Sequence, residues 1–371
     1  VLKVQPLNVE VNFTLGNLNE VSGYWKSAMK NFEICINNQE NNKLARQKHF
    51  DLQKRHSPEL ISKSNYFSEN SVTRFSEFLT FLYPLNDYIA LNAGYLFKNT
   101  NEKGGTSQSG QTYPGLDEGV VNTHGGQAGI TIKIRPLLST LYLQGTGLYY
   151  KGKVNFESYD DYDSTIDYTS LNYKIGLKVS PILNFLSVRL LYTHEDMNDL
   201  TQSLKLNNRN AITSNTIETM FDISFSEFDF PFSKRIFLYD SIRYRMLSDS
   251  NKRLSSYNEL TFRILSFAKY NMHLDLAGIF SYENSDFDSY NYEDATKLSL
   301  LPYWAPDNLS TYGGALRWKQ TIQNILGGNV TYQVSMQLTK DSINNTNYSP
   351  GVVLQYNSNY VDVKMSYYYT H

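Results

Sequence analysis

The residues best suited to catalysis are a histidine and an aspartate that stand two positions apart. His273 and Asp275 fall on one side of an extended chain, and a serine hydrolase needs such a base and an orienting carboxylate beside a nucleophile. Ser281 and Ser187 are the candidate hydroxyl groups, but no spacing brings either of them to His273. A polar face turned toward water explains the same residues, so we expect the chain not to be an enzyme.

Two further groups contain residue types that bind ions. Asp160, Asp161, Asp163 and Asp167 could take calcium, although they lack the glycine and the terminal glutamate of an EF-hand loop. The single cysteine, Cys35, has no Cys/His cluster around it that would hold zinc. A solvated loop is the simpler interpretation of the aspartates, and we expect neither a metal nor a cofactor.

Basic residues recur in one phase of segments that alternate between polar and apolar positions. They are Arg74, Lys133, Arg135, Lys174, Lys178, Arg189, Arg243, Arg245, Arg263, Arg317, Lys319 and Lys364. The acidic residues of this phase are Glu218, Asp222, Glu259, Asp275 and Asp362. One interpretation is that the cations pair with these acids across strands. The other is that the surplus of cations, in a tube of low dielectric constant, focuses a positive potential on an anionic solute or polymer.

Tyrosines stand in the same phase and add aromatic surface to it: Tyr142, Tyr150, Tyr360 and Tyr368. Their rings could stack on sugar faces while their hydroxyl groups stay in water. The chain has 30 Tyr among 371 residues, so abundance alone also explains their presence. Together, the basic residues and the tyrosines are the set that we expect to line a solute path.

The segments that carry these residues are expected to be β-strands with one apolar and one polar face. From Leu171 to Val179 every second residue is apolar, and similar alternation recurs from Pro58 to the C-terminus. No apolar run reaches the roughly 18 residues of a membrane-spanning helix, so any membrane segment must be a strand. Tight connectors, such as 84–87 and 136–138, alternate with long polar ones, such as 98–124.

This rhythm of short turns and long loops is typical of a transmembrane β-barrel. We count about sixteen strands between residues 59 and 370, with fourteen as the alternative because the tract 283–310 interrupts the alternation. An even number places both ends of the barrel in the periplasm. The sequence therefore predicts an all-β, antiparallel transmembrane barrel over residues 58–371, whose polar phase faces a lumen and whose apolar phase faces lipid.

The composition agrees with a barrel and argues against other classes of protein. Aromatic residues make up 14% of the chain and charged residues 19%, which is below the roughly 25% of soluble domains. The formal net charge is −2, which argues against a protein that coats nucleic acid. The chain begins at Val1 without a basic and then apolar leader, so a signal peptide has been removed or the sequence is a fragment.

Residues 1–57 follow a helical period instead. Apolar residues recur three to four apart over 7–21 and 24–36, and a charged helix is expected over 41–55. Small and large residues in this segment resemble one tetratricopeptide repeat: Leu15, Gly16, Gly23, Trp25, Ala28, Phe32 and Cys35. The resemblance implies a periplasmic segment that more repeats precede in the native protein, because one repeat cannot bury its apolar face alone.

The whole arrangement resembles a known family. A repeat, a charged linker helix, the entry 57–60 into the first strand and a barrel of about 16 strands are similar to the exopolysaccharide-export outer-membrane proteins, such as those for cellulose and poly-N-acetylglucosamine. The tracts Pro302–Pro306 and Gly313–Trp318 also resemble ones that recur in that group. The resemblance implies a bacterial outer-membrane channel for a growing polysaccharide, with helical repeats that dock periplasmic or inner-membrane synthase components.

We therefore predict a passive conduit that exports an exopolysaccharide of the biofilm matrix, an anionic one being a candidate, through a basic and aromatic lumen gated by outer loops. Residues 98–124 are the expected lid. A translocator of surface lipoproteins or other polypeptides is the first alternative, and a diffusion porin, which needs no helical repeat, is the second. The expected partners are the exopolysaccharide, outer-membrane lipids and synthase components, without nucleic acid.

Overall fold

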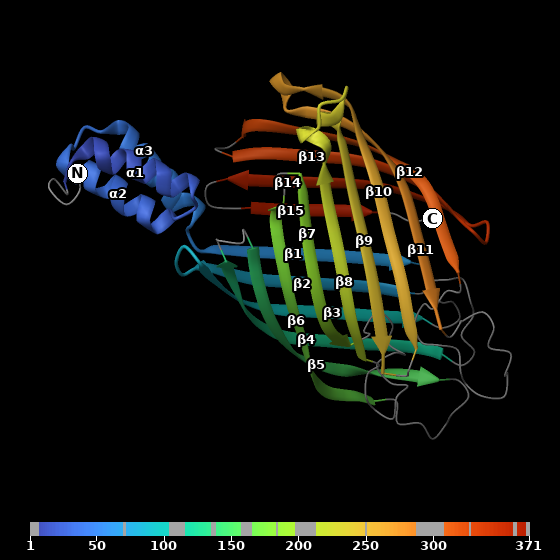
Figure 1. Cartoon of the computed structure of the whole chain (residues 1–371). Helices are drawn as coiled ribbons and strands as arrows, with labels where there is room; N and C mark the ends of the chain where they lie inside the picture. The colour runs from blue at the N-terminus through green and yellow to red at the C-terminus, as the bar shows by residue number, and fades with distance from the viewer. Residues whose placement is uncertain are drawn as a thin grey trace.

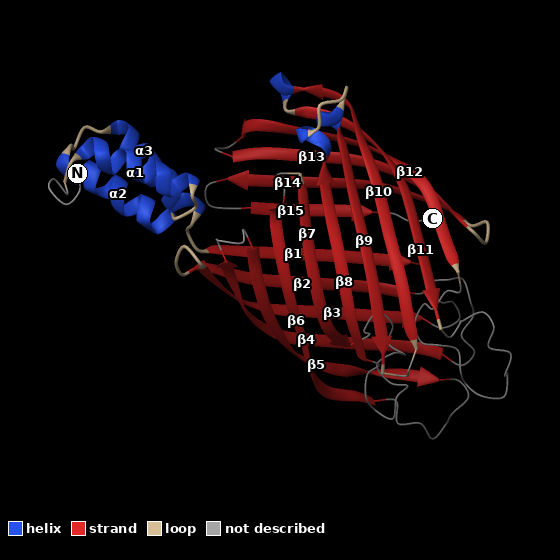
Figure 2. Cartoon of the chain, in the orientation of Figure 1, coloured by secondary structure: helices blue, strands red, loops and turns tan. Residues whose placement is uncertain are grey.

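The chain consists of a helical segment followed by one large sheet (Figure 1). The computed structural model describes residues 7–69, 72–103, 116–134, 139–156, 165–182, 185–196, 213–248, 251–286, 308–325, 328–358 and 362–368. Figure 2 shows that the first three helices form a body beside the strands. They end at Arg55 and the strands begin at Glu59, so the structure changes where the period of the sequence changes.

The three α-helices lie where the helical period predicted them. They are α1 Val9–Val21, α2 Trp25–Asn38 and α3 Lys43–Arg55. Asn8 and Asn42 cap α1 and α3, because each side-chain oxygen accepts a hydrogen bond of 3.0 Å from the backbone N–H three residues later. No helix in the described part of the chain is long and apolar enough to cross a membrane.

The helices pack around an aromatic side chain at their centre. Phe32 of α2 is fully buried and lies against Gly16 of α1, where a Cβ would stand 2.5 Å from Cε1 of the ring. Glycine is therefore required at position 16 for this approach of α1 to α2. Glu20 joins α1 to α3, because its carboxylate lies 2.8 Å from Nζ of Lys48 and 2.6 Å from Nη2 of Arg55.

In the described residues, fifteen antiparallel strands form the sheet, and each pairs with the next along the chain. They are β1 Glu59–Glu69, β2 Val72–Pro84, β3 Ile89–Lys103, β4 Leu116–Ile134, β5 Ser139–Phe156, β6 Thr165–Ile182, β7 Leu186–Asp196, β8 Thr213–Ser224, β9 Ile236–Leu247, β10 Lys252–Phe267, β11 Met272–Ser285, β12 Leu309–Ile325, β13 Gly328–Asp341, β14 Thr346–Ser358 and β15 Asp362–Tyr368. The expected all-β, antiparallel architecture is confirmed.

The described part of the chain contains fifteen strands, against the sixteen, or alternatively fourteen, that the sequence predicted for the whole barrel. The interrupted tract 283–310 contains the end of β11 and the start of β12, and residues 287–307 lie outside the described part. Because consecutive strands are antiparallel, β1 and β15 run in the same direction. β15 therefore ends on the side of the sheet that is remote from the helices, whereas β1 begins beside them. The expectation that the first strand begins and the last strand ends on the same, periplasmic side does not hold for the strands described.

The sheet curls until its first and last strands lie side by side (Figure 1). Its ladder of hydrogen bonds is continuous from β1 to β15, and among the described residues no ladder joins β15 to β1. We call the end of the sheet where β1 begins, beside the helices, the helical end. Most connectors there are short, for example 85–88 and 268–271. The connectors 104–115, 157–164, 197–212 and 286–308 all join strands at the opposite end.

The expected lid, 98–124, is mostly strand. β3 continues to Lys103 and β4 begins at Leu116, so only residues 104–115 connect them, and these lie outside the described part. The connector between β8 and β9 is the long one at the helical end, and the alternation did not predict it. It contains the 3₁₀ turns η3 Phe225–Glu227 and η4 Ser233–Arg235.

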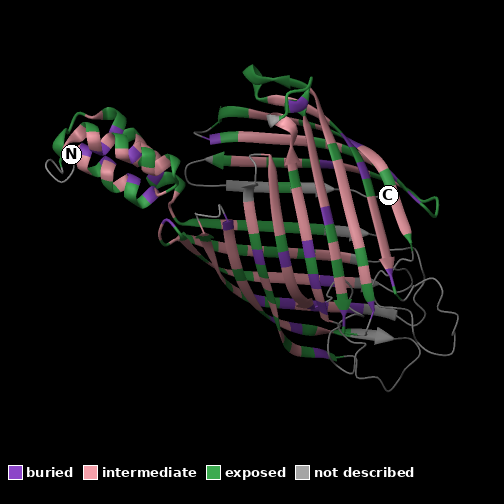
Figure 3. Ribbon diagram, in the orientation of Figure 1, coloured by how far each residue is buried: buried purple, intermediate pink, exposed green. Residues whose placement is uncertain are grey.

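The two faces of the sheet differ in polarity, as the alternation predicted. Exposed positions recur along the strands (Figure 3). The register places many exposed, large apolar side chains on one face, for example Leu79, Leu143, Ile175, Leu190, Ile242, Leu276, Leu316, Val334 and Leu354. On the other face, polar side chains reach across an intervening strand: Gln127 of β4 donates to Thr80 of β2, 2.9 Å away. Side chains converge on the concave side of a curved sheet, so this polar face is the concave one.

A turn of the sheet holds the helices. The backbone N–H of Lys26, in the first turn of α2, donates a hydrogen bond of 2.7 Å to Oδ1 of Asp87, which is buried in the β2–β3 turn. Nε1 of Trp25 donates to the carbonyl of Asn86 at 3.3 Å, and the Trp25 ring stacks on His56. The side chain of Tyr24 does not cap α2, so a carboxylate from the sheet takes that role.

Candidate functional site: the concave polar face

The register places most of the predicted path residues on the concave polar face. Residues directly opposite each other in adjacent strands point to the same face of the sheet. Arg74 is opposite Thr100, and Lys319 is opposite Gln333, so the face of each predicted residue follows from the register. The basic residues of this group are Arg74, Lys133, Lys174, Lys178, Arg189, Arg243, Arg245, Arg263, Arg317 and Lys319. Lys364 and Tyr368 pair with Gln355 and Gly351. Arg135 and Tyr360 lie outside the described residues.

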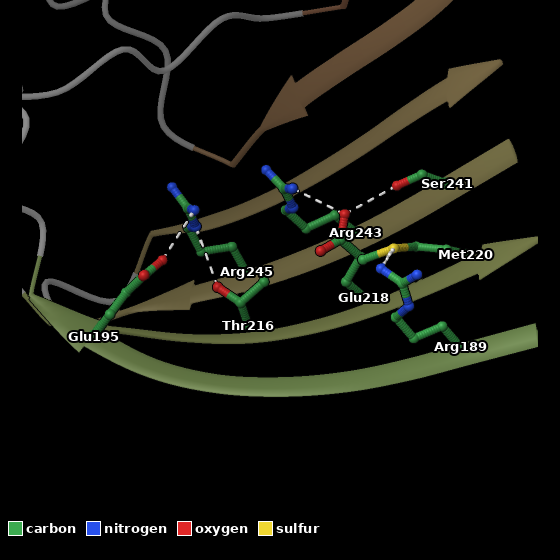
Figure 4. Close-up of polar contacts among 8 residues, drawn as sticks. All are labelled: Arg189, Glu195, Thr216, Glu218, Met220, Ser241, Arg243 and Arg245. Atoms are coloured by element: carbon green, nitrogen blue, oxygen red, sulfur yellow. Dashed lines mark hydrogen bonds and ion pairs between the residues drawn. The ribbon is translucent and has the colours of Figure 1, made fainter. Parts of the chain in front are cut away.

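Arginines of β9 form the first charged cluster on this face (Figure 4). Nη2 of Arg243 lies 2.8 Å from Oε1 of Glu218, which also accepts a hydrogen bond of 3.0 Å from Ser241. Arg245 reaches across β8 to Glu195 of β7, at 3.4 Å, and its Nε donates to Thr216. These two arginines are therefore neutralised by carboxylates of the same face.

A second cluster lies on β10, β11 and β12. Arg317 of β12 reaches across β11 and binds Glu259 of β10 through both of its Nη nitrogens, with Nη2 2.7 Å from Oε2. Tyr257 and Thr261 also donate to Glu259, at 2.7 and 2.9 Å. Nε of Arg263 lies 2.9 Å from Oδ1 of Asp275. The interpretation of cross-strand pairing is therefore confirmed for the arginines of both clusters.

The hydrolytic grouping, which the sequence did not favour, is not assembled with Ser281 or Ser187 in the structure. His273 lies 3.6 Å from Asp275, but Asp275 is also bound by Arg263. Ser281 stands six residues beyond Asp275 on β11, about 20 Å along a strand. Ser187 lies on β7, opposite Asp222 of β8, whereas His273 lies on β11, four strands away from β7. Neither hydroxyl group can reach His273 from these positions.

Tyr150 does not have the open ring that stacking on a sugar requires. It is fully buried, stacks on Tyr168 with ring centroids 4.9 Å apart, and donates a hydrogen bond of 2.8 Å to Asp196. Val121, Leu148 and Ile166 pack around it on the same face. This part of the polar face is therefore an apolar cluster, which corrects the expected role of Tyr150.

Four of the remaining cations lie together near the helical end of β4 to β7, whereas Arg74 lies on β2 and Lys319 on β12. Lys133 pairs with Thr140, Thr140 with Lys178, and Lys178 with Arg189, so three cations stand in one row across four strands. Lys174 stands four residues from Lys178 on β6. Among the described residues, none of these four cations forms an ion pair with a carboxylate. We call Lys133, Lys174, Lys178 and Arg189 the cationic row.

Tyr142 lies within the cationic row. It pairs with Gly176, which stands midway between Lys174 and Lys178, and a Cβ on Gly176 would collide with the tyrosine ring. Glycine therefore lets the ring lie over β6 between the two lysines. Arg189 makes a contact of 3.6 Å from Nη1 to Sδ of Met220, which carries no charge (Figure 4). The row thus combines four cations with one partly exposed aromatic ring.

Sequence reasoning missed several carboxylates of the polar face, among them Glu195, Asp196 and Glu283, which is bound by Arg253. Glu195 follows the polar phase of β7, so strict alternation could have found it. Asp196 is out of phase, yet its side chain turns to the polar face, where it accepts hydrogen bonds from Tyr150 and Ser170. No signal in the alternation predicts this reversal at the end of a strand.

Comparisons with known proteins identify a shared fold. No protein-family model matches the chain, and no curated protein matches it. A solved structure described as a bacterial polysaccharide outer membrane secretin is similar, with a TM-score of 0.55 and 12% sequence identity. The match covers 80% of this chain and 83% of the other. What the chain shares with a protein of the outer membrane is therefore its curved antiparallel sheet.

Proposed function

We propose that the sheet closes into a barrel that spans a bacterial outer membrane and passes an exopolysaccharide outward along its concave polar face. The chain would act as a passive conduit, without catalysis of its own. The observation that carries this proposal is the division of one curved sheet into an exposed apolar face and a polar face whose side chains bond across strands. Such a division matches lipid outside and water inside.

The likeness of fold supports the same function. A protein described as a polysaccharide secretin has a similar arrangement over most of its length. The residues proposed to line the lumen are those of the polar face, with the cationic row and Tyr142 at its helical end. Because β1 and β15 already lie side by side, closure needs little movement of either strand.

The helical segment has a proposed role in the periplasm. Gly16, Trp25, Ala28, Phe32 and Cys35, which carry the resemblance to a tetratricopeptide repeat, form its core together with α3. We propose that this segment receives components of the polysaccharide synthase at the entrance of the barrel. The β2–β3 turn that caps α2 supports this, because it holds the helices at the end of the sheet where the connectors are short.

A pair of arginine substitutions tests which face meets lipid. Leu276 is 49% exposed in the middle of β11, and Leu276→Arg should cost about 2–4 kcal/mol if that side chain enters the bilayer. Gln337→Arg places the same charge on the polar face of β13 and should leave insertion unchanged. Insertion into liposomes is measured by the difference in gel mobility between unheated and heated samples. Equal effects of the two variants would contradict the assignment of the faces.

Transport is tested in bilayers and in cells. The full chain should form pores in planar bilayers, and deletion of its gene should remove exopolysaccharide from the cell surface. A chain that stays soluble without detergent and gives no conductance would overturn the proposal. Loss of surface lipoproteins with unchanged polysaccharide would instead identify a polypeptide translocator.

A further inference from the structure

We infer that the cationic row is a binding site for carboxylate groups of the exported polymer, so that the substrate is an acidic polysaccharide. This inference rests on the proposed function and specifies its substrate class. In the row, four cations stand close together without a carboxylate partner among the described residues. A polyanion can supply that missing charge.

The distribution of charge on the polar face separates two kinds of cation. Five arginines, at positions 243, 245, 253, 263 and 317, are each bound to a glutamate or an aspartate of the same face. These pairs are structural, and they leave no net charge for a solute. By contrast, Lys133, Lys174 and Lys178 are the side chains of the row whose ammonium groups make no ion pair in the described part of the chain.

The row has both a transverse and a longitudinal extent. Across the sheet, Lys133, Lys178 and Arg189 span three strand spacings, about 14 Å, and so form an arc at one level. Along β6, Lys178 and Lys174 stand about 13 Å apart, with the ring of Tyr142 between them. A polymer that moves along the strands therefore meets a cation, an aromatic face and a second cation in turn.

The groups on this path match the groups of an acidic sugar chain. Ammonium and guanidinium groups bind carboxylates, and a tyrosine ring packs against the apolar face of a sugar while its hydroxyl group stays polar. The nearby acid Glu218 is held by Arg243 and Ser241, so it does not neutralise the row. Asp222, on the same face of β8, is exposed and forms no ion pair among the described residues. A neutral polymer would make no use of four cations, and a cationic polymer would be repelled.

The test measures block of single channels in planar bilayers by oligogalacturonate, with maltooligosaccharides as the neutral probe and chitosan oligomers as the cationic one. Wild-type channels should be blocked by oligogalacturonate, and the block should weaken as salt screens the charges. The triple variant Lys133→Gln, Lys174→Gln, Lys178→Gln should raise the concentration for half-block at least tenfold. The control Lys234→Gln, Lys269→Gln, Lys340→Gln removes equal charge away from the polar face and should block as the wild type does.

Failure of this inference can be distinguished from failure of the proposed function. The channels could conduct but be blocked equally by the acidic and neutral probes, or best by chitosan oligomers. That result would contradict an acidic substrate but would still agree with a conduit. Absence of any conductance in all variants overturns both. Equal loss of block in the triple variant and in its control would show that overall charge, and not the row, attracts the polymer.

Discussion

At the scale of single residues, the ion pair of Glu259 and Arg317 is the contact whose loss should lower the free energy of unfolding most clearly. The side chains are 14% and 27% exposed, so removing one charge leaves the other in a partly desolvated place. Glu259→Gln should therefore lower the free energy of unfolding by about 2 kcal/mol, and Glu259→Gln with Arg317→Gln should recover part of that loss. Denaturant unfolding in detergent micelles measures both.

The matched control for this prediction is an acid of the same face without such a pair. Asp222 is exposed and forms no ion pair within the described residues. Asp222→Asn should change the free energy of unfolding by no more than about 0.5 kcal/mol. A loss as large as that of Glu259→Gln would show that charge alone, and not pairing, stabilises the polar face.

At the scale of elements, the helical segment should lose stability in acid. Burial alone would raise the pKa of Glu20, but hydrogen bonds and charge from Lys48 and Arg55 outweigh it and lower that pKa from its ordinary value of 4.5. The contribution of Glu20 is therefore complete above pH 4.5 and is lost as the pH falls through the lowered value. The urea midpoint of helix circular dichroism at 222 nm should fall between pH 5 and pH 3.

His56 adds a separate, earlier step in the same direction. Burial first, and then the charges of Lys133 and Arg55, lower its pKa from 6.5, despite Asp87, so the folded segment holds it neutral. Stability is then lost as the pH falls below 6.5, because the unfolded chain takes up the proton more readily. Glu20→Gln should remove the lower step and keep the upper one. A midpoint that does not depend on pH in the wild type would contradict both assignments.

The joint between α2 and the β2–β3 turn is also tested at this scale. Asp87→Ala removes the carboxylate that caps α2, which should cost about 0.5–2 kcal/mol and free the helices from the sheet. Trypsin should then cleave faster at Arg55, while the strands stay resistant. Glu33→Ala, on an exposed position of α2, is the control and should leave the rate unchanged. Equal rates in both variants would place the attachment elsewhere.

At the scale of the whole molecule, closure of the sheet is the prediction that matters most. Leu60 of β1 and Met365 of β15 lie on the first and last strands and both follow the apolar phase. Spin labels at these positions, in a Cys35→Ala background, should give one short distance in lipid nanodiscs because the two strands lie side by side. A broad or long distance distribution would mean that the sheet remains open between β15 and β1.

The sequence predicted the elements well because each has its own local period. Leu171–Val179 alternates along a strand whose two faces meet different surroundings, so β6 could be located without knowledge of its neighbours. The helices were equally local, since Asn8 and Asn42 stand at their starts. The strand number was harder, because the tract 283–310 carries no clear period.

The pairing of charges could not be predicted, because it depends on register and curvature. Arg245 and Glu195 are fifty positions apart and meet across an intervening strand, whereas Lys178 and Arg189 stand directly opposite with like charge. Nothing in the alternation separates these two cases. The burial of Tyr150 was missed for a similar reason, since Asp196 turns against its phase to accept a hydrogen bond from the hydroxyl group of Tyr150.

One carboxylate bridges the two parts of the chain, and this has a mechanical consequence. Asp87 belongs to a turn of four residues between two long strands, yet its carboxylate caps the N-terminus of α2. A pull on that helix is delivered to the turn directly, without slack from a flexible tether. The joint is therefore a direct mechanical link, and force exerted on the helices reaches the β2–β3 turn before the rest of the sheet.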